Sequence, residues 1–198
     1  MENRSSRLPY RVKGGKLEKE YLVLETPAGP KEIPWSSVKL LTLGIIESQL
    51  GMGEEHKSFL RSMIRSVVFG DKINEEPKVK SVQRTMLLDI FVEGEELPFR
   101  LDSAYINYRA FLGKVSHISA QNFKKLLALL ALNSRECRLD HSLVNFLAPR
   151  MKIEKSFASL YDYELERENI KKNPGLQVPQ CEIEIQEFWE EANEESAG

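Results

Sequence analysis

Two turn-centred segments constrain the fold of this chain more than any other feature of its sequence. In the first, Leu17–Leu24 alternates and then becomes apolar, Thr26–Pro30 has the composition of a turn, and Lys31–Trp35 resumes an extended pattern. Proline fixes φ and glycine permits positive φ, so we predict a β-hairpin with a five-residue loop. Pro34 has no N–H to donate to a ladder, which predicts an edge strand or a bulge there.

The second segment repeats this pattern later in the chain. Thr85–Glu93 and Glu96–Leu101 are strand-like and meet at a Glu-Gly-Glu turn. Between the two hairpins, Leu40–Ile46 is short, apolar and partly β-branched, which predicts a buried strand. Antiparallel hairpins followed by a helix indicate an α+β fold and argue against a doubly wound sheet.

Two stretches with helical spacing predict the helices that accompany these hairpins. Apolar residues between Phe59 and Val68 recur along one face and predict a helix inserted at residues 54–69. Ser119 is a favourable N-cap for an amphipathic helix over Ala120–Leu132. Asn133 is expected to end that helix in the left-handed conformation.

The C-terminal third predicts further helices and an acidic end. A short helix is expected over Asp140–Leu147, with Asp140 as its N-cap, and a longer helix over Glu154–Lys172. Cys181–Ile185 alternates like an edge strand, and Glu187–Glu195 predicts a short acidic helix. We therefore expect a disordered lead over residues 1–9, an α+β domain over residues 10–133 and a helical extension with an acidic tail over residues 134–198.

The net charge of −2 conceals an uneven distribution. Residues 182–198 contain seven glutamates and no lysine or arginine, whereas the rest of the chain has 28 lysines and arginines against 23 acidic residues. A mildly basic body with an acidic end is not the composition of a dedicated nucleic-acid binder, so no nucleic-acid partner is expected. The acidic end is typical of a solubilising tail, or of a segment that covers a basic surface of the same chain.

No cofactor or metal site is expected from the sequence. Cys137, Cys181 and three separated histidines cannot form a four-ligand zinc site without carboxylates. The polar N-terminus lacks the apolar region of a signal peptide, and the longest apolar run, Leu126–Leu132, is too short to cross a membrane. These features predict a cytoplasmic protein with reduced thiols.

The densest polar and aromatic stretch, RLDSAYINYR, is the first candidate contact surface. Tyrosine rings beside guanidinium groups can stack on a base or grip a peptide. The candidate residues are Arg100, Tyr105, Asn107, Tyr108 and Arg109.

Two further groups are candidates for contact with a partner. Lys57, Arg61 and Arg65 recur at helical spacing and form a basic stripe that suits anionic lipid headgroups or an acidic protein surface. Phe188 and Trp189 stand in a highly charged segment, so they are expected to dock on the body of the protein or on a partner.

Three stretches together resemble a known family. They are the early hairpin that ends in Ile33–Val38 (IPWSSV), the later hairpin TMLLDIFVE/ELPFRL and the amphipathic helix SAQNFKKLLALLAL. Over residues 17–46 and 85–132 the chain thus resembles the pleckstrin-homology-like (PH-like) and GRAM-like domains common in bacteria. The resemblance implies a partial barrel or sheet of antiparallel hairpins with a packing helix, and lipid, peptide or protein partners in place of catalysis.

Together these patterns predict a cytoplasmic protein-interaction or scaffold module with an unidentified protein partner. One alternative is a peripheral binder of anionic lipid that uses the basic stripe. The other is an enzyme with a motif-poor site, which would require a pocket where polar groups with displaced pKa values converge. We do not expect an enzyme, because no catalytic motif accompanies the fold pattern.

Overall fold

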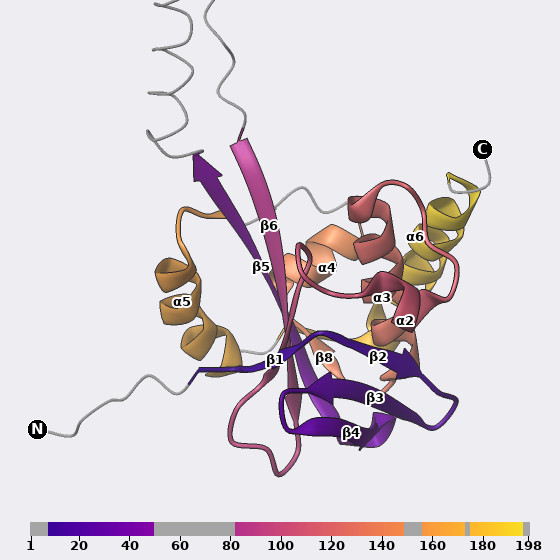
Figure 1. The fold of residues 1–198 in the computed structure, drawn as a ribbon, viewed down its shortest axis with the longest axis horizontal. Helices are drawn as coiled ribbons and strands as arrows, with labels where there is room; N and C mark the ends of the chain where they lie inside the picture. Colours follow the sequence, from indigo (N-terminus) through magenta and orange to yellow (C-terminus); the bar gives the residue numbers. More distant parts are fainter. Residues whose placement is uncertain (1–7, 50–81, 149–155, 173–174, 196–198) are drawn as a thin grey trace, which may run out of the picture.

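Residues 8–49, 82–148, 156–172 and 175–195 are described by a computed structural model of the chain (Figure 1). Their strands form two sheets, and neither strand order closes a barrel. The larger sheet is ordered β1 (Tyr10–Val12), β7 (Phe99–Asp102), β6 (Val82–Val92), β5 (Val38–Gln49), β8 (Arg138–Leu139) and β10 (Leu176–Gln177), and β9 (Ser156–Phe157) also pairs with β5. The smaller sheet is ordered β2 (Gly14–Leu17), β3 (Tyr21–Thr26) and β4 (Gly29–Pro34). The fold is therefore α+β, as predicted.

Helices cover both faces of the larger sheet. In Figure 1, α5 (Leu160–Lys172) lies on one side of the β5–β6 pair, and α3 (Ser119–Asn133), α4 (His141–Leu147) and α6 (Glu182–Glu194) lie on the other. The short helix α2 (Tyr108–Leu112) packs on β2 and α3. Within the described ranges, no helix combines the length and the apolar character that a membrane span requires.

Strand β5 is buried on both faces, which explains its almost continuous apolar sequence. Leu41, Leu43 and Ile45 join the main core, whereas Thr42 and Gly44 face α5. The buried strand predicted in this region is confirmed, and it is longer than the apolar run because its ladder with β6 continues to Gln49.

Both predicted hairpins are present. β3 and β4 pair antiparallel, and their turn is shorter than the predicted five residues because Thr26 pairs with Gly29. Pro34 ends β4, an edge strand of the smaller sheet, as its missing N–H predicts. β6 and β7 also pair antiparallel, but β7 begins at Phe99 and not at Glu96, so the turn is longer than predicted. Asp89 lies directly opposite Arg100 in their register.

The parallel pairings of the larger sheet were not predicted. β1 runs parallel to β7, and β8 and β9 run parallel to β5. β8, β9 and β10 contain two residues each, so they are too short to show a periodic pattern in the sequence. These pairings join the chain that follows α3 to the central sheet.

Helix α3 agrees with its prediction in extent and in its buried face, but its two ends differ. Ser119 is the first helical residue and Ile118 occupies the N-cap, without a side-chain capping bond. Asn133 stays in the helix and donates from its side chain to the Leu129 carbonyl, so the expected left-handed ending is wrong. The predicted face is buried and comprises Phe123, Leu126, Leu127, Leu130 and Ala131.

The predicted edge strand at Cys181–Ile185 is wrong, because helix α6 begins at Glu182. Helical spacing buries Ile185, Phe188 and Ala192, while Ile183 is left 71% exposed. The apparent alternation therefore arises from a helix whose apolar face begins only at its fourth residue. The longer predicted helix also differs, since α5 begins at Leu160.

One core cluster unites residues on both sides of the predicted boundary at 133. Leu43, Leu88 and Phe123 belong to the same cluster as Leu143 and Phe188. Helix α6 is therefore packed into the core and is not a free acidic tail. Residues 1–7 of the predicted lead and all of the predicted inserted helix lie outside the described residues.

Candidate functional site

The candidate site is a groove between the loop that follows α2, helix α3 and helix α6. Asn107 caps α2 by accepting a hydrogen bond from the Ala110 amide, and Gly113, with φ of +69°, ends the helix. The following loop is held by Asn122 of α3, whose side chain accepts from the Ser116 amide at 2.7 Å and donates to the Ser116 carbonyl at 2.9 Å. One wall of the groove is thus fixed by hydrogen bonds between the Asn122 side chain and the Ser116 backbone.

The opposite wall is helix α6, which is anchored by Phe188. Its ring is buried, packs edge-on against Phe146 of α4, and has the Lys124 ammonium 4.2 Å from its centroid. Docking of Phe188 places the next residue, Trp189, beside α3 with its indole partly exposed. Asn193 lies one turn further along the same face.

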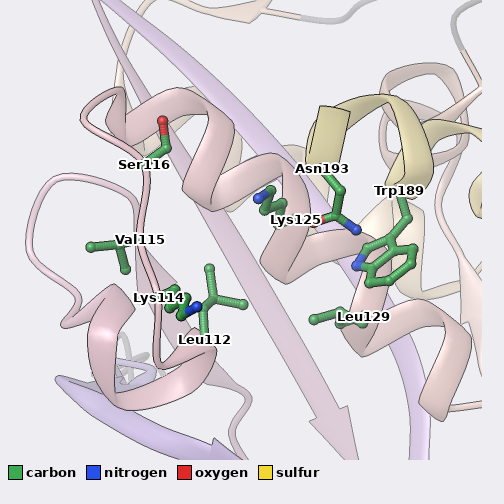
Figure 2. A pocket seen from close by; sticks show the side chains of 8 residues that line it. All are labelled: Leu112, Lys114, Val115, Ser116, Lys125, Leu129, Trp189 and Asn193. Atoms are coloured by element: carbon green, nitrogen blue, oxygen red, sulfur yellow. The ribbon is translucent and has the colours of Figure 1, made fainter. Parts of the chain in front are cut away.

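The groove has a volume of about 550 Å³, within the range of ligand-binding clefts. Its apolar lining consists of Leu112, Val115, Leu129 and Trp189. Its polar lining consists of Lys114, Ser116, Lys125 and Asn193. Figure 2 shows the α2–α3 loop at one end, the indole and the Asn193 amide at the other, and α3 between them. No carboxylate is among these lining residues.

The two lysines give this groove its charge. Lys114 lies in the loop and Lys125 on α3, and neither ammonium makes an ion pair with another residue of the described ranges. The side-chain amide of Asn193 is likewise without a hydrogen bond to a described residue. An apolar cleft with two cations and an amide can hold an anionic group and an apolar group together.

The tyrosine-rich stretch does not form a single exposed surface. Tyr105 is 82% exposed, and Asn107 and Arg109 are also exposed. Tyr108 instead turns inward and donates from its hydroxyl to the Ser103 carbonyl at 2.6 Å, and burial raises its pKa. Arg100 is only 7% exposed and lies inside the protein. Two of the five candidates therefore support the fold from within.

The remaining candidates fall into two groups. Lys57, Arg61 and Arg65 lie outside the described residues. Phe188 docks on the body of the protein, as expected of a large aromatic side chain in a charged segment, and Trp189 lines the groove. Lys114 and Lys125 were missed, because an isolated lysine in a loop or on a helix carries no pattern in the sequence.

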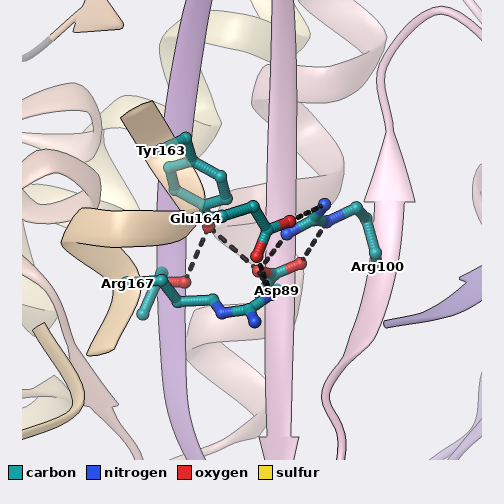
Figure 3. A network of polar contacts seen from close by, with 6 residues as sticks. Asp89, Arg100, Tyr163, Glu164 and Arg167 are labelled. Carbon is teal, nitrogen blue, oxygen red and sulfur yellow. Dashed lines mark hydrogen bonds and ion pairs between the residues drawn. The ribbon is translucent and has the colours of Figure 1, made fainter. Parts of the chain in front are cut away.

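A second polar cluster lies between α5 and the sheet (Figure 3). Arg100 makes two hydrogen bonds of 2.7 Å to Asp89, one to each carboxylate oxygen, and a third of 2.5 Å to Glu164. Arg167 lies 2.6 Å from Glu164 and 3.5 Å from Asp89. Tyr163 donates to Asp89 at 3.1 Å and lies 3.0 Å from the Thr42 hydroxyl. We call these residues the α5 network.

The α5 network balances its own charges. Two carboxylates face two guanidinium groups, and Asp89 is completely buried. Burial alone would lower the pKa of Arg100, but the hydrogen bonds and charges of Asp89 and Glu164 hold it above its ordinary value. Burial, and then the charge of Asp89, raise the pKa of Tyr163 well above its usual range. The described part of this network thus attaches α5 to the sheet. The feature of the sequence that could have revealed it is the Asp and the Arg on the two paired strands.

Three other groups with displaced pKa values are also buried. Burial raises the pKa of Cys137 to about 12 and raises that of Cys181, so both thiols are protonated and poor nucleophiles at neutral pH. Burial raises the pKa of Asp140 to about 6, although it accepts hydrogen bonds from the amides of Leu43, Ser142 and Leu143. Among the described residues, no three side chains of the metal-binding types cluster to hold an ion.

Comparison of the chain with known protein families, with curated proteins and with solved structures finds no match. The resemblance to PH-like and GRAM-like domains therefore remains a prediction.

Proposed function

We propose that this protein acts as a protein-interaction module and that the groove between α3 and α6 receives a segment of its partner. The observation that carries the proposal is the exposed side of Trp189 within a cleft that already has an apolar floor. Tryptophan is among the residues that contribute most to protein–protein binding, because it buries a large area at little cost in side-chain entropy. The fixed loop beside it means that the cleft needs little rearrangement to bind.

The geometry supports this function over the enzymatic alternative. A motif-poor active site would need polar groups with displaced pKa values to converge on a pocket. In the part of the chain that the structure describes, the residues with displaced pKa values are Arg100, Tyr108, Cys137, Asp140, Tyr163 and Cys181. None of them lines the groove. Peripheral binding of anionic lipid through Lys57, Arg61 and Arg65 stays an alternative proposal, since those residues lie outside the described ranges.

Site-specific photo-crosslinking tests the proposed function. A photoreactive phenylalanine at Val115, which is 38% exposed in the groove, is compared in cells with the same group at Tyr21, which is 36% exposed on β3. We expect a protein adduct of discrete mass from Val115 only, and we expect Asn193→Phe, which fills the groove without changing its charge, to abolish it without changing the melting temperature. Equal adducts from both positions, or an adduct that Asn193→Phe leaves intact, would overturn the proposal.

A further inference from the structure

We infer that the groove selects an acidic segment that carries an apolar anchor residue, with its carboxylates at Lys114 and Lys125 and its anchor against Trp189. This inference rests on the proposed function and adds the chemistry of the partner. Its first support is the charge of the lining, which contains two ammonium groups and no carboxylate. A ligand carboxylate would meet two cations there, whereas a ligand cation would meet no carboxylate among the lining residues.

The second support is the direction of the glutamates on α6. The helix and its C-cap residue together carry seven glutamates from Glu182 to Glu195, yet Trp189 and Asn193 occupy a face apart from nearly all of them. At 100° per residue, the glutamates from Glu184 to Glu194 fall outside the face of Trp189 and Asn193. Glu195, just past the end of the helix, accepts a hydrogen bond from the Gln121 side chain of α3 at 3.3 Å. Glu182 does share the face of Trp189, but it lies two turns away and pairs with Arg135 at 3.3 Å.

The third support is the apolar surface that the groove offers beside the two cations. Leu129 lies on α3 next to Trp189, and Leu112 and Val115 complete the apolar lining on the side of the loop (Figure 2). An aliphatic or aromatic side chain placed there is removed from water at about 25 cal/mol per Å² of apolar area. The unpaired amide of Asn193 is available to the backbone of the bound segment.

The test uses Trp189 as its own reporter. The chain has two tryptophans, and Trp35 is only 7% exposed, so Trp35→Phe leaves Trp189 as the single tryptophan. The probe is a synthetic peptide of alternating glutamate and leucine, titrated while Trp189 emission and its quenching by acrylamide are followed. Three matched peptides replace glutamate by glutamine, glutamate by lysine, or leucine by serine. Vesicles with and without anionic lipid form a separate arm.

We expect saturable binding of the glutamate–leucine peptide, with at least tenfold weaker binding of the glutamine and serine peptides. The double variant Lys114→Glu/Lys125→Glu should lose at least tenfold in affinity for the acidic peptide and gain affinity for the lysine peptide. The control double variant Lys19→Glu/Lys172→Glu changes the net charge equally at exposed positions outside the groove, and it should bind as the parent does.

Each other outcome overturns the inference in a distinguishable way. Equal binding of the glutamate and glutamine peptides removes the acidic selectivity but leaves a groove for apolar segments, so the proposed function survives. A response of Trp189 to anionic vesicles and to no peptide overturns both and favours a lipid surface. Loss of binding in the control double variant equal to that in the groove variant shows that only overall charge matters, which also overturns the inference.

Discussion

Substitution Gly44→Ala should separate α5 from the sheet, because the Tyr163 ring occupies the place of a side chain on β5. A Cβ at this position would lie 2.3 Å from two ring carbons, whereas carbon atoms in contact lie 3.4 Å or more apart. Among the described glycines only Gly29, Gly94 and Gly113 have positive φ, so alanine can adopt the backbone of Gly44. The cost is therefore steric, and the ring has to move by more than 1 Å.

That displacement breaks both hydrogen bonds of the Tyr163 hydroxyl, to Asp89 at 3.1 Å and to Thr42 at 3.0 Å. Overpacking costs about 1–3 kcal/mol, and loss of a buried bond to a charged group about 1–3 kcal/mol. Replacing a glycine inside a strand by alanine stabilises the fold by about 0.5–1 kcal/mol, because the unfolded chain has less conformational entropy to lose. We expect a loss of about 2–4 kcal/mol in the free energy of unfolding, measured by urea denaturation.

A double-mutant cycle isolates the steric cause. In a Tyr163→Ala background the space is empty, so Gly44→Ala should cost about 0 kcal/mol or stabilise slightly. The coupling energy is then roughly 2–4 kcal/mol. The reasoning is refuted if Gly44→Ala costs the same in both backgrounds, or if it is neutral in the parent protein.

Three further predictions concern the α5 network, the cap of α4 and the anchor of α6. Asp89→Ala leaves Arg100 without its two-bond partner and should destabilise the protein by about 3–5 kcal/mol in urea denaturation; a cost below about 1 kcal/mol would contradict a closed network. Asp140 has a pKa of about 6 in the fold against 3.8 ordinarily, so its stabilising contribution is complete below about pH 4 and is lost as the pH rises through 6. The free energy of unfolding of the parent should therefore fall by about 2–3 kcal/mol across that range, and that of Asp140→Asn should fall less. If the two proteins show the same pH dependence, another group is responsible. Phe188→Ala should cost about 3–5 kcal/mol, while Ile183→Ala, at an exposed position of the same helix, should cost under about 0.5 kcal/mol; similar losses from both would show that α6 does not pack as described.

Much of the local structure followed from patterns longer than six residues. The two hairpins, the buried strand, the face of α3 and the Asp140 cap of α4 all have a period or a capping residue in the sequence. The two-residue strands have neither, because their position is set by packing across the sheet. Helix α6 was misread at its start because two glutamates flank Ile183 and imitate the alternation of a strand.

The candidate site was predictable only in part. Trp189 stood out because an indole in a charged segment has to contact something, but Lys114 and Lys125 gain meaning only when the loop and α3 come together. Arg100 was wrongly predicted to lie on a contact surface. Its position in a hairpin opposite Asp89 was readable once the register was known, and that pairing takes the guanidinium out of any surface.

The late completion of the core has a consequence for how this chain folds during synthesis. When strand β5 is synthesised, two of its later contacts do not yet exist. The Leu41 carbonyl has no hydrogen bond until the Asp140 amide is made, and the core around β5 lacks Phe188. Bonds across such long stretches of sequence form slowly because the intervening chain has to lose its freedom first. Apolar strands therefore stay uncovered during synthesis until α6 has been made. A chain truncated before α6 should be retained by chaperones or removed by proteases.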